Sequence, residues 1–128
     1  MKFILVVLAL AGGYYYVSRH FEFNDTLVYA KKHPESRYAP AIDYYVGTIY
    51  YQRENYGKAQ EAFTQLLTDF PTTQYAPTAL ERLSDAAEYN GDWQTAKDSL
   101  QRYVEEYPNG KDMQVVQKRL ELLKYHHP

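Results

Sequence analysis

Apolar residues recur every three or four positions along most of the chain, which is the spacing of one face of an α-helix. The spacing predicts helices over residues 21–32, 38–53, 56–69 and 112–125, and two further helices around 79–86 and 93–104. Phe23, Leu27 and Ala30 form the apolar face of the first of these segments. The chain is therefore expected to be all-α.

Turn signals separate the predicted helices. Glu54 and Asn55 interrupt one helical pattern and Gly91 and Asp92 interrupt another. Asp92 is a good N-cap residue, because its carboxylate accepts a bond from a free amide of the first helical turn. Short helical hairpins are therefore expected on both sides of these breaks.

A repeat of 37 residues organises these hairpins. Pro34, Pro71 and Pro108 lie 37 residues apart, and the first two each begin a Pro-x-x-x-Tyr-Ala-Pro stretch. The repeat predicts two complete units, 34–70 and 71–107, followed by a capping helix and tail, 108–128. Residues 21–33 match the second helix of a preceding unit whose first helix is absent.

The pattern resembles the tetratricopeptide repeat (TPR) family. The signature positions of that family are occupied here by Gly47, Ala59, Phe63, Pro71, Ala96, Leu100 and Pro108. Ser84 replaces the glycine in the second unit. The longer connection ending in Tyr-Ala-Pro resembles cell-envelope TPR proteins of bacteria, such as outer-membrane assembly lipoproteins and Tol-associated periplasmic coordinators. This resemblance implies a helical-hairpin solenoid that binds proteins.

An apolar segment, 1–20, precedes the repeats, and residues 3–17 contain no charge. We expect a helix there that inserts into a membrane or packs with other copies. The residues expected to take part are Phe3, Ile4, Leu5, Val6, Val7, Leu8, Leu10, Gly12, Gly13, Tyr14, Tyr15, Tyr16 and Val17. Ala9-Leu10-Ala11 also fits a signal-peptide cleavage site, although the apolar run before it is short.

The first helix of each unit is expected to line the inner face of the solenoid, as the resemblance implies. The residues predicted to form a partner groove are Tyr44, Thr48, Tyr51, Glu81, Arg82, Asp85, Glu88 and Lys118. The TPR groove that binds acidic tails carries Lys and Asn where this chain has Tyr44 and Thr48. An alternative interpretation is that the tyrosines cover apolar surface and Arg82 pairs with the acidic side chains of a solvated helix face.

Composition narrows the possible functions. The net charge of −2, with no run of basic residues beyond Lys31-Lys32, argues against a nucleic-acid binder. The absence of cysteine excludes disulfides, thiolate metal sites and a lipidated N-terminal cysteine in this sequence. Glu81, Asp85 and Glu88 have no histidine at ligand spacing, and no catalytic or nucleotide motif is present. We expect no catalysis, cofactor or metal.

Two functional hypotheses remain open. The first is a protein-interaction scaffold of the bacterial cell envelope, anchored in the inner membrane by residues 1–20, with the repeats in the periplasm. The second is a structural subunit that assembles into an extracellular filament through the apolar helix and the repeat faces. The 15 tyrosines, which provide large contact areas at low entropic cost, fit either one.

Overall fold

The computed structural model describes residues 2–20 and 23–128, and the side chains of residues 2–16 and 25–128. This part of the chain contains helices and no strand. The helices are α1 (Lys2–His20), α2 (Phe23–Lys32), α3 (Ala39–Gln52), α4 (Tyr56–Asp69), α5 (Ala76–Tyr89), α6 (Trp93–Glu106) and α7 (Met113–His126). The all-α prediction is confirmed, and the predicted helices end within a few residues of the observed ones.

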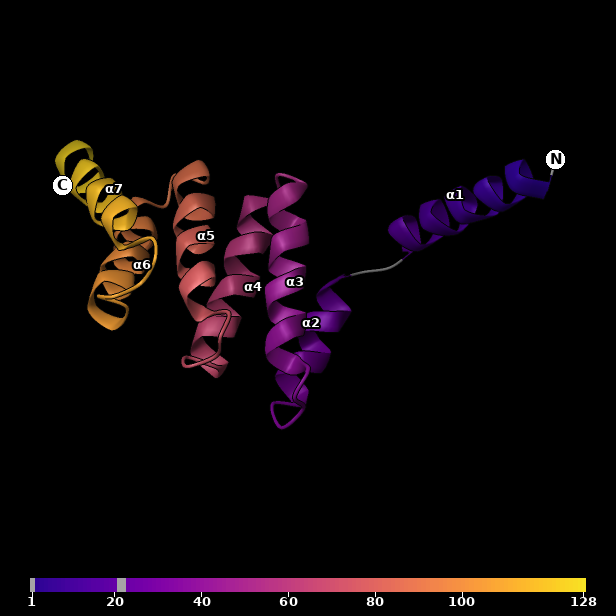
Figure 1. Cartoon of the computed structure of the whole chain (residues 1–128), viewed down its shortest axis with the longest axis horizontal. Helices are drawn as coiled ribbons and strands as arrows, with labels where there is room; N and C mark the ends of the chain where they lie inside the picture. Colours follow the sequence, from indigo (N-terminus) through magenta and orange to yellow (C-terminus); the bar gives the residue numbers. More distant parts are fainter. Residues whose placement is uncertain (1, 21–22) are drawn as a thin grey trace.

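Helices α2 to α7 stack side by side into a short solenoid (Figure 1). Each helix packs against the next one along the chain. Contacts between alternate helices define two layers. Lys31 of α2 pairs with Asp69 at the end of α4, and Arg119 of α7 pairs with Asp85 of α5. Helices α3, α5 and α7 therefore form one layer, and α2, α4 and α6 form the other.

Complementary side-chain sizes set the spacing within each hairpin. In α3, Gly47 faces the fully buried ring of Phe63 so closely that an added Cβ would come within 2.8 Å of it. One repeat later, Ser84 takes the glycine position and Leu100 takes the phenylalanine position. The buried Ser84 hydroxyl donates a hydrogen bond to the Ala96 carbonyl at 3.0 Å. Glycine thus lies opposite the bulky phenylalanine ring in the first unit, and the larger serine lies opposite the smaller leucine in the second.

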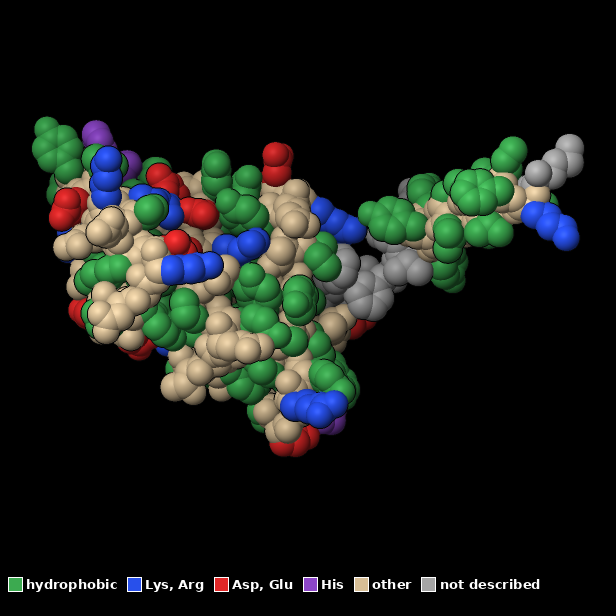
Figure 2. Space-filling view, in the orientation of Figure 1, with side chains coloured by type: hydrophobic (Ala, Val, Ile, Leu, Met, Phe, Trp, Pro, Cys, Tyr) green, Lys and Arg blue, Asp and Glu red, His purple; other side chains and the backbone are tan. Residues whose placement is uncertain are grey.

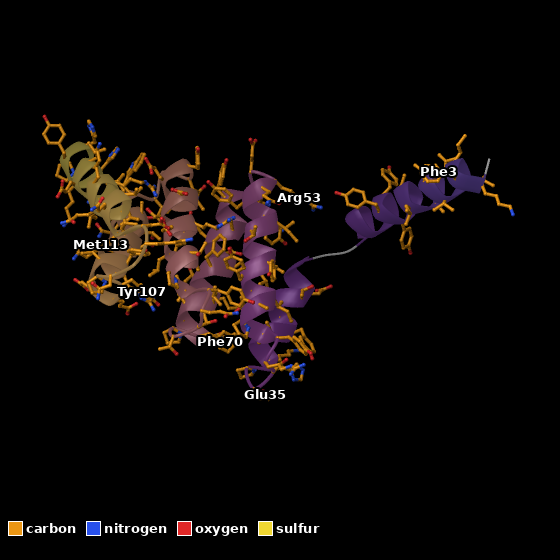
Figure 3. The ribbon with its side chains drawn as sticks, in the orientation of Figure 1. Phe3, Glu35, Arg53, Phe70, Tyr107 and Met113 are labelled. Atoms are coloured by element: carbon orange, nitrogen blue, oxygen red, sulfur yellow. The ribbon has the colours of Figure 1, made fainter. Side chains whose placement is uncertain are left out.

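The short and long connections lie at opposite ends of the helices, on the two edges of the array. Arg53, beside a short hairpin turn, lies at one end, and Glu35, in a longer connection, lies at the other (Figure 3). The short turns use a residue with positive φ, Glu54 in one and Gly91 in the other. As predicted, Asp92 then caps its helix by accepting a bond from the Thr95 amide at 3.2 Å.

A buried carboxyl group lies where α2, α3 and α4 meet. The Asp43 side chain is fully buried, and its Oδ1 accepts a hydrogen bond from Gln65 at 2.9 Å. Gln65 also donates to the Leu27 carbonyl of α2 at 3.0 Å. Within the described part of the chain, the second oxygen, Oδ2, has no hydrogen-bond partner. The position one repeat later is the buried Leu80.

Helix α7 ends the array with a polar outer face. It buries Val116, Leu120 and Leu123 against the preceding unit. The positions at which α5 buries Leu80, Ser84 and Ala87 are occupied in α7 by exposed Gln117, Glu121 and Lys124. A polar outer face of this kind is what a terminal repeat needs for solubility.

Helix α1 lies apart from the solenoid (Figures 1 and 3). Its large apolar side chains from Phe3 to Tyr16 are each at least 50% exposed, and apolar side chains cover much of the face of the helix that Figure 2 shows. The expected membrane-type helix is not found, because no helix in the described part of the chain is long and apolar enough to cross a bilayer. The Val17 side chain lies outside the described residues.

Candidate functional site

The α3, α5 and α7 layer presents one continuous face. Salt bridges and ring contacts connect the three helices across this face, which we call the repeat groove. Its positions recur every 37 residues, so each helix contributes equivalent side chains. The predicted residues Tyr44, Thr48, Tyr51, Glu81, Arg82, Asp85, Glu88 and Lys118 all lie on these three helices. The assignment of a partner to them remains a prediction.

Three groove residues on α7 were missed by the sequence interpretation. Val115, Leu122 and Tyr125 are exposed, and they occupy the positions held by Thr78, Asp85 and Glu88 in the unit before. The 37-residue repeat, applied once more to the predicted positions of Asp85 and Glu88, would have identified Leu122 and Tyr125, and Val115 precedes Lys118 by one helical turn on the same face. The groove is therefore aromatic on α3 and acidic on α5, and it combines apolar side chains with Lys118 and Arg119 on α7.

The aromatic part of the groove is tightly built. The Tyr44 ring stacks on Tyr75 with centroids 4.8 Å apart, and its edge contacts Phe63 of the core. The guanidinium of Arg82 lies over the same ring at 5.9 Å. Thr48 uses its hydroxyl within its own helix, where it donates to the Tyr44 carbonyl at 2.9 Å. Tyr44 therefore joins α3 to the next unit and is only partly available to a partner.

The acidic part is held by an arginine from the closing helix. The Arg119 guanidinium contacts Asp85 Oδ1 at 2.5 Å and Glu88 Oε2 at 3.2 Å. The alternative interpretation of the sequence gave this role to Arg82, which lies beside these acidic residues on the same helix. Arg82 instead lies over Tyr44, and Arg119 reaches across from α7, a contact that only the folded arrangement reveals.

Burial raises the pKa values of two carboxyl groups in this part. Burial raises the pKa of Asp85, and the neighbouring Arg119 only partly opposes the effect. The pKa of Glu81 is raised to about 7 by burial, by a hydrogen bond with Asp112 and by the charge of that carboxylate. The carboxyl groups of Glu81 and Asp85 thus have partners that do not fully replace the water lost on burial.

A cavity opens in the groove between α3 and α5. It has a volume of about 350 Å³ and is lined by Tyr51, Asp85, Glu88 and Tyr89. The Tyr89 ring stacks on Tyr56 with centroids 4.6 Å apart, and Tyr51 meets the edge of Tyr56 at 5.7 Å. Two tyrosines and two carboxylates therefore line one cavity.

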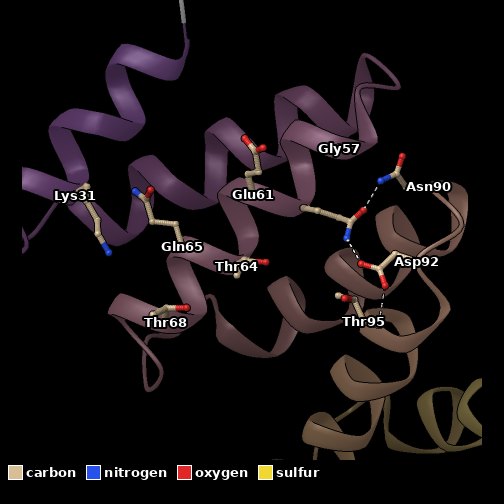
Figure 4. A pocket seen from close by; sticks show the side chains of 10 residues that line it. Lys31, Gly57, Glu61, Thr64, Gln65, Thr68, Asn90, Asp92 and Thr95 are labelled. Carbon is tan, nitrogen blue, oxygen red and sulfur yellow. Dashed lines mark hydrogen bonds between the residues drawn. The ribbon is translucent and has the colours of Figure 1, made fainter.

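A larger cavity of about 630 Å³ lies on the opposite layer (Figure 4). Amides and hydroxyls line it, and a chain of bonds crosses one end, from Asn90 to Gln60 at 2.9 Å and from Gln60 to Asp92 at 3.1 Å. These bonds join α4 to the turn of the next unit. We attribute this cluster to the stacking of repeats, because its polar groups bond one another.

In the described part of the chain, no three His, Cys, Asp or Glu side chains lie close enough to hold a metal ion. Asp85 and Glu88 pair with Arg119 instead, and Glu81 shares a hydrogen bond with Asp112. The geometry of the groove suits binding of a protein segment, since its polar groups sit among exposed aromatic and aliphatic side chains.

Residues 37–118 match the family model YfiO, described as outer membrane lipoprotein. The chain belongs to the YfiO family. The match confirms the resemblance to cell-envelope TPR proteins that the repeat pattern indicated. No curated protein matches the chain.

The YfiO match covers both complete hairpins and most of the groove. It runs from the connection before α3 into the first half of α7, and it includes Gly47, Phe63 and the acidic residues of α5. Helices α1 and α2 lie outside the matched range. The family assignment therefore concerns the solenoid that carries the groove, and α1 is a separate feature of this chain.

Proposed function

We propose that the protein is a non-catalytic interaction scaffold of the cell envelope, and that its repeat groove holds a segment of another protein. The observation that carries this proposal is the construction of the groove. Exposed apolar side chains on α7 and tyrosines on α3 flank a partly desolvated acidic strip on α5. Such a mixture of apolar anchors and oriented polar groups is typical of surfaces that bind peptides or helices.

Family membership supports the same conclusion. Most of the groove lies within the range that matches the YfiO model, an outer membrane lipoprotein family, whereas Arg119, Leu122 and Tyr125 follow that range. We further propose the repeat units 34–70 and 71–107 as its framework, with 21–33 and 108–128 as partial units at the two ends. Because the outer face of α7 is polar, we propose that a partner binds the repeat groove and not this end of the solenoid.

Helix α1 is proposed to attach the scaffold to an apolar host. Its exposed apolar side chains, from Phe3 to Tyr16, need cover from lipid, another protein or a second copy. A second copy would favour the filament alternative, in which α1 packs with other α1 helices. Sedimentation of the purified chain without detergent would separate a second copy from the other two hosts, because only self-association produces large assemblies of the purified chain.

Site-specific photo-crosslinking in cells tests the groove. A photoreactive phenylalanine analogue at Lys118 is expected to give a discrete adduct with one envelope protein. The same analogue at Glu61, which lines the opposite layer, is the matched control and is expected to give no such adduct. Adducts of equal yield from both positions, or only from position 61, would refute the groove as the binding face.

A further inference from the structure

We propose that the cavity lined by Tyr51, Asp85, Glu88 and Tyr89 is an anchor pocket for a cationic side chain, lysine or arginine, of the bound protein segment. This inference rests on the proposed function, because it names what the partner inserts into the repeat groove. Its volume of about 350 Å³ is in the range of small-ligand cavities and accommodates one long side chain.

The walls of the anchor pocket favour a cation. Aromatic rings carry partial negative charge on their faces and attract ammonium and guanidinium groups. The Tyr89 ring is held in place by stacking on Tyr56, with an interplanar angle of 14°. Tyr51 meets the same Tyr56 ring edge-on. The two tyrosines of the cavity are thus set by a common neighbour, so little ordering is needed when a ligand enters.

The carboxylates of the anchor pocket provide the matching charge. Asp85 and Glu88 share a single guanidinium, that of Arg119, so one negative charge is left over between the three groups. The guanidinium of Arg82 lies over the Tyr44 ring, and its charge lowers the pKa of Asp85 without reversing the effect of burial. Burial raises the pKa of Asp85 in spite of Arg119, which is the behaviour of a carboxylate with too little compensation. A further cation would supply it.

Other ligands suit the pocket poorly. An anion would face the two carboxylates of Asp85 and Glu88. A divalent ion lacks a third protein ligand, since no group of three suitable side chains is found among the described residues. A neutral aliphatic side chain would leave both carboxylates partly desolvated without a new partner. Charge complementarity therefore favours a basic residue.

The proposal is tested with small probes by NMR of the full chain labelled with 13C-tyrosine. The probes are n-butylammonium and n-butylguanidinium, with 1-butanol and butyrate as neutral and anionic counterparts. Tyr51→Phe and Tyr89→Phe assign the two ring signals. We expect saturable shifts of both signals with either cation, and no saturable shift with the other two probes.

Variants that each remove one negative charge identify the site. Glu88→Gln is expected to weaken butylammonium binding at least about fivefold, the loss of one charge-assisted contact. Glu61→Gln removes the same charge from the opposite layer and is expected to leave the affinity unchanged. Thermal melts are used to check that both variants are folded. Asp85→Asn serves as a second pocket variant. Equal weakening by Glu61→Gln would mean that butylammonium binding responds only to the net charge of the protein, and the proposal would then be wrong.

This test is separable from that of the proposed function. If the Lys118 position yields its adduct but neither cation shifts the Tyr51 and Tyr89 signals, the scaffold stands and the anchor pocket is wrong. Equal shifts with 1-butanol would overturn the anchor pocket too. If cations bind but the adduct forms only from position 61, the proposed function is wrong. The proposal that a basic side chain of the partner enters the anchor pocket is then wrong as well.

Discussion

Replacing Gly47 with serine is expected to lower the free energy of unfolding by about 1–3 kcal/mol, the usual cost of overfilling a packed core. An added Cβ would approach the Phe63 ring to 2.8 Å, and that ring is fully buried and has little room to move. Gly47→Trp would have a much larger effect for the same reason. Urea unfolding followed by circular dichroism measures the change.

The second repeat supplies a compensating change. It combines Ser84 with Leu100, so Gly47→Ser together with Phe63→Leu copies that pair into the first repeat. We expect the double variant to be at least about 1 kcal/mol more stable than the sum of the two single effects, because contacting residues are coupled. Gly57→Ser, where an added Cβ meets nothing within 4 Å, is the control. Strictly additive effects would contradict the proposed packing.

Replacing Asp43 with leucine is expected to stabilise the protein at pH 8 and to have a smaller effect near pH 4. Burial raises the pKa of Asp43 from 3.8 to about 7, against the opposing hydrogen bond from Gln65. A shift of about 3 units, at about 1.4 kcal/mol each, sets an upper limit of about 4 kcal/mol. Leucine is the natural choice because Leu80 fills the equivalent position.

The direction of this pH dependence follows from proton binding. The folded state holds a proton on Asp43 between about pH 4 and pH 7, whereas the unfolded state has released it. The contribution of this group to stability therefore falls as the pH rises through that window and is constant above it. Asp43→Asn, which retains an oxygen to accept the bond from Gln65, should remove the dependence. A stability difference between wild type and Asp43→Leu that stays constant from pH 4 to pH 8 would disprove it.

The helices were predictable because their signals are local. Asp92 caps its helix as expected, Asn55 at the equivalent position caps α4, and the prolines at positions 40 and 77 lie in first helical turns. The repeat of 37 residues then gave the stacking order. It also contained information that the sequence interpretation did not use, since Leu122 and Tyr125 follow from it, as does the contrast between Asp43 and Leu80 at equivalent positions.

Contacts between layers and units could not be predicted. Arg82 is nearer to Asp85 in sequence, but Arg119 approaches it in space because α5 and α7 lie in the same layer. The anchor pocket depends on how Tyr51, Tyr56 and Tyr89 pack between α3, α4 and α5, which no linear spacing specifies.

The measurement that tests the central claim most directly is the affinity of the crosslinked partner segment for variants of the full chain, by calorimetry. Tyr51→Ala and Leu122→Ala alter the groove, and Thr64→Ala alters the opposite layer. A groove that binds the segment predicts at least about tenfold weaker binding for the first two variants, as expected when a central contact is truncated. It predicts unchanged binding for Thr64→Ala. Weaker binding in Thr64→Ala alone would contradict the account.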